Sequence, residues 1–118
     1  QAQNLPGFEE MVDSTIDHTV PVVNPEQLIF EYARNQNLVI LDTREQKEFE
    51  VSHIQGARCV GYDNFKMESV SDIKKNRKIF VYCSIGYRSE KIGEKLQDAG
   101  YSQVFNLYGG IFNWINND

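Results

Sequence analysis

The sequence predicts an α/β domain with a mostly parallel sheet, and three observations lead to this fold class. First, residues 38–41 and 79–82 are unbroken apolar runs, as expected of strands that are covered on both faces. Second, amphipathic helical patterns alternate with the strands along the chain. Third, a chain of 118 residues with 41% hydrophobic content is long enough for one domain with its own core.

The N-terminal third predicts an edge strand and a helix. Residues 1–18 are polar apart from a few apolar side chains, which fits either a short amphipathic helix docked on the domain or a loosely ordered arm. Residues 20–23 predict a short strand, and Pro21 assigns it to a sheet edge because proline cannot donate to the ladder. Asn24 then caps a helix that begins at Pro25. The apolar stripe of this helix consists of Leu28, Ile29, Tyr32 and Ala33.

The middle of the chain predicts shorter elements between the two buried strands. Thr43 and Gln46 have the spacing of a capping box and predict a short helix that ends near Val51. A brief strand is expected at residues 58–60. One short helix is expected within residues 65–73, which are otherwise polar and mixed.

The C-terminal third predicts two helices and one more strand. A helix follows Arg88 and stops at Gly100, and a strand is expected at residues 104–107. Gly109 and Gly110 then form a turn before a terminal helix. The side chains expected to face the core are Ile92, Leu96 and Ala99 in the first helix and Ile111, Trp114 and Ile115 in the second.

Composition argues against several classes of function. The net charge of −5 offers no basic footprint for nucleic acid, and apolar runs of five residues or fewer are too short to span a membrane. Two cysteines and two histidines without metal-ligand spacing predict no structural zinc, and no cofactor is expected. The chain begins without methionine, so a cytoplasmic protein and a periplasmic protein with a removed signal peptide both stay open.

Cys83 is the leading candidate for catalysis. It follows a predicted buried strand and precedes a loop that contains Gly86 and then a helix. In this position, backbone N–H groups and a helix N-terminus point at the sulfur and favour thiolate, which is the nucleophilic form. Asp42 ends the other buried strand, and sites of parallel sheets lie outside the C-terminal ends of strands. The alternative for Cys83 is a buried structural thiol.

Three separated motifs resemble those of the rhodanese family. They are residues 42–45 (Asp-Thr-Arg-Glu) with Glu48-Phe49 and residues 53–57 (His-Ile-Gln-Gly-Ala), then residues 83–89 (Cys-Ser-Ile-Gly-Tyr-Arg-Ser), then residues 108–114 (Tyr-Gly-Gly-Ile-Phe-Asn-Trp). The first resembles the opening signature of the family, the second its active-site loop and the third its closing element. Each motif alone is a weak signal, whereas all three in order are a strong one.

In order and spacing, these motifs resemble a single-domain rhodanese-like sulfurtransferase over residues 20–117. The chain is accordingly divided into residues 1–18, an arm or docked helix, and residues 19–118, the rhodanese-like domain. The resemblance implies a five-stranded parallel sheet flanked by helices. It also implies that Cys83 takes sulfane sulfur from thiosulfate, a persulfide or a polysulfide and passes it to a thiol, cyanide or a protein acceptor.

The loop after Cys83 is predicted to bind the substrate. Its members are Ser84, Ile85, Gly86, Tyr87, Arg88 and Ser89. Their backbone N–H groups should form an anion cradle, for which Gly86 supplies a turn with positive φ. The resemblance implies that Arg88 pairs with Asp42 and tightens the loop, a role that we favour over direct contact with substrate. Arg44 either adds positive potential at the mouth of the site or is a solvated residue of the first helical turn.

Other interpretations stay open beside sulfur transfer to a small acceptor. Arg88 is the only basic residue of the loop and stands near its end, which counts against thiosulfate as the physiological donor. A Cys-based phosphatase or arsenate reductase would use a loop one residue longer than the six residues from Cys83 to Arg88. An interaction module that delivers sulfur to a protein partner is another alternative. His53 is expected to orient backbone, and Cys59 to be a passive residue separated from Cys83 by one strand.

Overall fold

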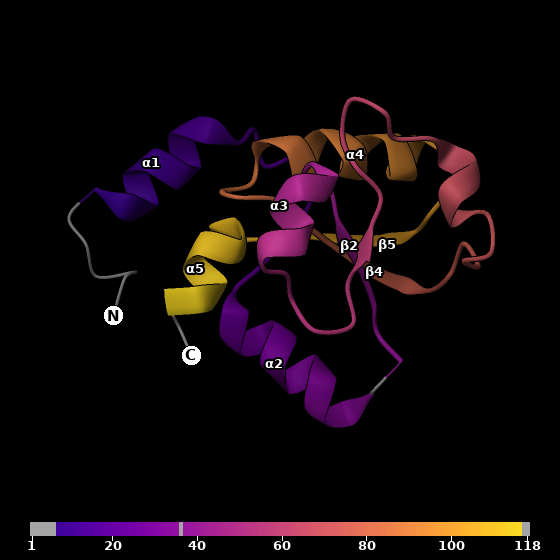
Figure 1. The fold of residues 1–118 in the computed structure, drawn as a ribbon, viewed down its shortest axis with the longest axis horizontal. Coiled ribbons are helices and arrows are strands. Elements are labelled where there is room, and N and C mark those ends of the chain that lie inside the picture. Colours follow the sequence, from indigo (N-terminus) through magenta and orange to yellow (C-terminus); the bar gives the residue numbers. More distant parts are fainter. Residues whose placement is uncertain (1–6, 36, 117–118) are drawn as a thin grey trace.

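The computed structural model describes residues 7–35 and 37–116, which form a five-stranded sheet covered by helices (Figure 1). The strand order is β1-β5-β4-β2-β3, and all neighbouring strands are parallel. The strands are β1 (Val22–Val23), β2 (Val39–Asp42), β3 (Arg58–Cys59), β4 (Lys78–Tyr82) and β5 (Gln103–Leu107). The predicted fold class is confirmed, and β1 lies at the sheet edge as Pro21 predicts.

Helices cover both faces of this sheet. They are α1 (Phe8–Thr15), α2 (Pro25–Arg34), α3 (Gln46–Val51), α4 (Tyr87–Asp98) and α5 (Gly110–Asn116), with a 3₁₀ turn at Met67–Val70. Figure 1 shows α4 on one side of the sheet and α2 and α5 on the other. Because successive strand residues point to opposite faces, Ile79 and Val81 join the core cluster under α4, while Phe80 and Tyr82 join the cluster under α2 and α5.

Helix α1 packs on the domain through a small apolar cluster of its own. Its buried members are Phe8, Val12 and Ile16, and they lie against Val22, Ile85 and Tyr108. Beyond α1, the buried carboxylate of Glu90 accepts the backbone N–H of Asp17 at 2.9 and 3.1 Å and that of Thr19 at 3.2 Å. A docked helix, one of the two alternatives for the N-terminal segment, is therefore present, whereas residues 1–6 lie outside the described part of the chain.

The start of α3 differs from the prediction. Glu45, and not Thr43, is the N-cap: the side chain of Glu45 accepts the Glu48 N–H, and the side chain of Glu48 accepts the Glu45 N–H at 3.1 Å. Thr43 is buried, and its hydroxyl donates to the Tyr82 carbonyl at 3.1 Å. The Thr43–Gln46 capping box was therefore a wrong prediction, because the threonine hydroxyl is already used between two strands.

Some side chains predicted to face the core are exposed. Ile29 is 47% exposed because α2 buries Leu28, and the next residue of a helix points about 100° further round. Ile115 is 56% exposed because it lies near the end of α5, past the core cluster. The helix expected within residues 65–73 is reduced to the 3₁₀ turn.

Candidate active site

Cys83 lies directly after β4, one of the central strands, where the chain turns into α4. Only 2% of the residue is exposed. Gly86 is the N-cap of α4 with φ +148°, a backbone conformation that favours glycine, and it donates its N–H to the Cys83 Sγ at 3.1 Å. A Cβ on Gly86 would lie 3.2 Å from the Ile16 Cγ2. The expected glycine turn is thus present, with α1 packed directly behind it.

A buried polar network surrounds the sulfur. The Ser89 Oγ lies 3.4 Å from the Cys83 Sγ and 2.6 Å from the Asn106 Oδ1. The Asn106 Nδ2 donates to the Gly86 carbonyl at 3.1 Å. Asn106 therefore holds the Ser89 hydroxyl and the Gly86 carbonyl, both of which lie beside the sulfur-binding turn. Sequence reasoning missed Asn106, although an asparagine inside an otherwise apolar strand was a signal, since a buried amide needs hydrogen-bond partners.

The N-terminus of α5 holds the opposite side of the loop. The Ile111 N–H donates to the Cys83 carbonyl at 2.9 Å, and the Phe112 N–H donates to the Ser84 carbonyl at 3.3 Å. Gly110 has φ +61°, and a Cβ there would lie 2.3 Å from the Ser84 carbonyl oxygen. The glycine pair thus lets the helix backbone reach the loop, which explains why the closing motif accompanies the active-site loop.

Arg88 does not pair with Asp42, and this part of the prediction was wrong. Its guanidinium forms a two-point ion pair with Glu48 of α3, with Nη1–Oε1 at 2.9 Å and Nη2–Oε2 at 3.3 Å. Nη2 also donates to the Ser84 Oγ at 3.0 Å. The hydrogen bond from Arg88 lowers the pKa of Glu48 to about 2. Glu48 belongs to the first of the three motifs, but its position in the sequence did not predict this pairing.

Asp42 instead binds Arg44, two residues along the chain. The Asp42 carboxylate is fully buried and accepts from the Arg44 backbone N–H at 2.9 Å, Nε at 3.0 and 3.2 Å and Nη2 at 2.8 Å. Arg44 is only 5% exposed and also donates to the Ser52 carbonyl at 2.7 Å. The solvated position expected for Arg44 was therefore wrong, and its positive charge is paired with Asp42. The tight turn after β2 places the Arg44 side chain against Asp42 at the end of the same strand. The Asp42 carboxylate is therefore already paired and does not bind Arg88.

The remaining members of the predicted loop take different places. Ile85 packs against the α1 cluster, whereas Tyr87, the first residue of α4, is 47% exposed. His53 contacts the Phe49 carbonyl through Nδ1 at 2.8 Å, so the expected backbone contact is confirmed. Cys59 is on β3, separated from β4 by β2, as expected, and burial raises the pKa of its thiol.

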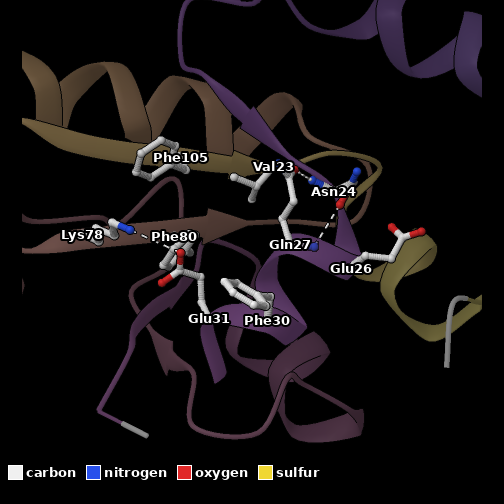
Figure 2. Close-up of a pocket in the computed structure, with 9 residues that line it drawn as sticks. All are labelled: Val23, Asn24, Glu26, Gln27, Phe30, Glu31, Lys78, Phe80 and Phe105. Carbon is white, nitrogen blue, oxygen red and sulfur yellow. Dashed lines mark hydrogen bonds and ion pairs between the residues drawn. The ribbon is translucent and has the colours of Figure 1, made fainter. Parts of the chain in front are cut away.

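A pocket lies elsewhere on the domain. This pocket of about 520 Å³ is lined in part by Phe30, Phe80 and Phe105, and Lys78 at its edge pairs with a glutamate of α2 at 3.2 Å (Figure 2). Lys78 is the first residue of β4, whereas Cys83 follows the last. None of the residues that line the pocket belongs to the loop after Cys83, so the pocket is separate from the sulfur.

Within residues 7–35 and 37–116, no group of three or more histidine, cysteine, aspartate or glutamate side chains is placed to hold a metal ion. Over the same ranges, no helix has both the length and the apolar character needed to cross a membrane. The chemistry that the described residues offer is that of one cysteine whose sulfur accepts a backbone N–H at the N-terminus of α4, beside a serine hydroxyl.

Comparisons with known proteins match most of this chain. A model of the rhodanese-like domain matches residues 26–117, which leaves α1 outside the match. Among solved structures, the rhodanese-like domain from an Anabaena sp protein, determined by solution NMR, has a TM-score of 0.73 at 25% sequence identity. That similarity covers 82% of this chain and 74% of the other.

Curated relatives are longer than this chain. A tRNA uridine(34) hydroxylase of Listeria welshimeri is 35% identical over 89 residues, which is 71% of this chain and 28% of that protein. The uncharacterized protein YqhL of Bacillus subtilis is 32% identical over 75 residues, which is 64% of this chain and 59% of that protein. The chain thus spans less than two thirds of the length of either relative.

Proposed function

This chain belongs to the rhodanese-like domain family, and we propose that it is a sulfurtransferase that carries sulfur as a persulfide on Cys83. The observation that carries the proposal is the environment of the Cys83 sulfur. A backbone N–H lies 3.1 Å away and a serine hydroxyl 3.4 Å away, at the N-terminus of a helix of 12 residues. The N–H group and the helix dipole stabilise negative charge on sulfur, both in a thiolate and in a persulfide anion, while the Ser89 hydroxyl donates its proton to Asn106 at 2.6 Å.

The first half-reaction loads the cysteine. The Cys83 thiolate attacks the outer sulfur of the donor, and a new S–S bond forms between them. The bond between that sulfur and its leaving group breaks, and the electron pair departs with the leaving group, which is a thiolate from a persulfide or sulfite from thiosulfate. The low exposure of Cys83 favours this chemistry, because the reacting sulfur is terminal and small enough to enter the cradle.

The second half-reaction unloads it. A thiolate or cyanide attacks the outer sulfur of the Cys83 persulfide, and the electron pair of the broken S–S bond returns to Cys83. The covalent intermediate divides one difficult transfer into two easier displacements. The final acceptor is a small thiophile or the cysteine of a protein partner, and both use the same step. In its protein-acceptor form the domain is a sulfur carrier.

Two other activities have less support. Hydroxylation of tRNA is named for relatives of which this chain spans 28–39%, and a net charge of −5 is a poor match for RNA. Phosphatase chemistry needs an arginine free to bind phosphate oxygens. In this loop, Arg88 is already bound by Glu48 at two points.

The test is turnover with cyanide as acceptor, measured as thiocyanate release with a persulfide, a polysulfide or thiosulfate as donor. We expect turnover with at least one donor, its loss in Cys83→Ser and its retention in Cys59→Ser, since Cys59 lies two strands away. Turnover that survives Cys83→Ser would refute the proposal. Cys83-dependent hydrolysis of an aryl phosphate would favour the phosphatase instead.

A further inference from the structure

We infer that Glu48 determines donor specificity: by neutralising Arg88 it makes the site prefer organic persulfides, whose leaving group is a thiolate monoanion, over thiosulfate, whose leaving group is the sulfite dianion. This inference rests on the proposed function, because it concerns the donor of the same half-reaction. Three features of the loop favour this preference: the ion pair itself, the charges around it and the aromatic side chains in and beside it.

The ion pair with Glu48 uses the hydrogen-bond donors with which Arg88 could otherwise bind an anionic substrate. Both Arg88 Nη atoms bind Glu48, and Nη2 is also committed to the Ser84 Oγ. The Arg88 side chain is 26% exposed and the Glu48 side chain 36%, so the pair lies at the surface of the loop. A dianionic donor approaching Arg88 therefore meets a carboxylate beside the cation, and the two charges largely cancel.

The other cations near the loop are neutralised as well. The Arg44 Nη2 lies 2.8 Å from the Oδ2 of Asp42, the last residue of β2. Lys91, one turn into α4, lies 3.4 Å from Asp17 and 3.6 Å from Glu94. The carboxylate of Glu90 is held by backbone N–H groups and not by a cation. Carboxylates thus outnumber cations around the loop, which opposes an anionic donor in proportion to its charge.

Two exposed aromatic side chains, one in the loop and one on α5, suit an organic leaving group. Tyr87 directly precedes Arg88 and is 47% exposed, and Phe112 of α5 is 49% exposed. The backbone of Phe112 is tied to the loop through the Ser84 carbonyl. These apolar surfaces can contact the carbon chain of an organic persulfide. Thiosulfate has no carbon chain and therefore gains no such contact.

The preferred loading step is balanced. In Cys83–S⁻ + R–S–SH → Cys83–S–SH + R–S⁻, the new S–S bond joins Cys83 to the terminal sulfur and the old S–S bond breaks. The electron pair of the old bond leaves with R–S⁻, and no external oxidant or reductant is needed. With thiosulfate the leaving group is sulfite, a dianion, which needs more positive charge in the site than the Arg88–Glu48 pair leaves.

The decisive variant is Glu48→Gln, with Glu50→Gln as the matched control. Glutamine is also accepted at the third position of a capping box, so α3 keeps its cap. Glu50 is on the same helix and exposed, and its contact is with Gln46 rather than with the loop. Both variants remove one negative charge from α3, and only the first releases Arg88.

The experiment measures the second-order rate of Cys83 persulfide formation by quenched-flow mass spectrometry, with thiosulfate and with 2-hydroxyethyl persulfide. In wild type we expect the organic persulfide to react faster. In Glu48→Gln we expect the thiosulfate rate to rise about tenfold, while the rate with the organic persulfide, which carries at most one negative charge, stays within about threefold. The gain with thiosulfate should shrink at high salt, because screening weakens the contact between Arg88 and the dianion.

The double variant Glu48→Gln/Arg88→Gln shows whether the released arginine is responsible, and it should lose the thiosulfate gain. A gain that persists in the double variant, an equal gain in Glu50→Gln or an unchanged thiosulfate rate in a folded Glu48→Gln protein would overturn the inference and leave the proposed function intact. Failure of every donor to load wild-type Cys83 would overturn both.

Discussion

Replacing Arg44 by methionine should destabilise the domain far more than the same replacement of Arg88. The Asp42 carboxylate is 0% exposed and is bound by the Arg44 side chain through Nε and Nη2 at 2.8–3.2 Å. Methionine leaves that carboxylate buried without its cation. Breaking a buried ion pair in this way costs about 3–5 kcal/mol, a large share of the stability of a domain.

The ion pair between Arg88 and Glu48 is partly exposed to solvent. Its side chains are 26% and 36% exposed, so water can solvate Glu48 after the arginine is removed. Partly exposed pairs contribute about 1 kcal/mol or less. Arg88→Met should therefore lower stability by an amount near that limit, although the same number of charges is lost.

Urea denaturation followed by circular dichroism separates the two cases. With a slope of about 2 kcal/mol per molar urea, Arg44→Met should shift the midpoint by about 2 M and Arg88→Met by about 0.5 M or less. Equal shifts, or a larger shift for Arg88→Met, would contradict the assignment of the Arg44 pair as buried and the Arg88 pair as partly exposed. A larger Arg88 effect is what an Arg88–Asp42 pair would have produced.

Three further predictions concern the loop and its supports. Gly110→Ala should abolish Cys83 persulfide formation, measured by intact mass, because its Cβ would lie 2.3 Å from a loop carbonyl oxygen; full loading would contradict the close approach. Asn106→Leu should lower the free energy of unfolding by about 1–3 kcal/mol in thermal denaturation, since a buried carbonyl and hydroxyl lose their partner; an unchanged melting temperature would argue against the network. The pKa of Glu48 is lowered from 4.5 to about 2 in the folded protein, so its pair with Arg88 stabilises fully above pH 4.5 and is lost as pH falls toward 2. The stability difference between wild type and Glu48→Gln should therefore shrink over that range in acid denaturation, and a constant difference would contradict the assignment.

The sheet and the position of Cys83 could be predicted because they depend on local patterns. Two unbroken apolar runs predicted the central strands, and both end where the sequence places them, at Asp42 and just before Cys83. Gly86 stands at the one loop position whose backbone needs a positive φ and whose N–H reaches the sulfur. These features require only the chemistry of a short segment.

The charge pairing could not be predicted in the same way. Two arginines and two carboxylates allow more than one pairing, and the choice depends on the turn after β2 and on the placement of α3 beside the loop. The resemblance favoured a pair between Arg88 and Asp42. In the structure, the Asp42 carboxylate is bound instead by Arg44, which is only two residues away in the sequence. A pairing between segments 40 residues apart, such as Arg88 with Glu48, becomes visible only in the folded chain.

Asn106 illustrates a signal that was available. The strand Gln103–Leu107 carries an amide in its buried middle, and a buried amide must satisfy its hydrogen bonds. Sequence position alone did not reveal that the partners are Ser89 and Gly86, which come from a different element. The hydrogen-bond network beside the Cys83 sulfur is thus shared between β5 and the start of α4.

The most direct test of the central claim is the intact mass of the reduced protein before and after incubation with 2-hydroxyethyl persulfide, with Cys83→Ser and Cys59→Ser alongside. The account predicts a gain of one sulfur atom in wild type and in Cys59→Ser, no gain in Cys83→Ser, and reversal of the gain by cyanide. A gain that remains in Cys83→Ser and disappears in Cys59→Ser would contradict it, because the sulfur would then reside on the wrong cysteine.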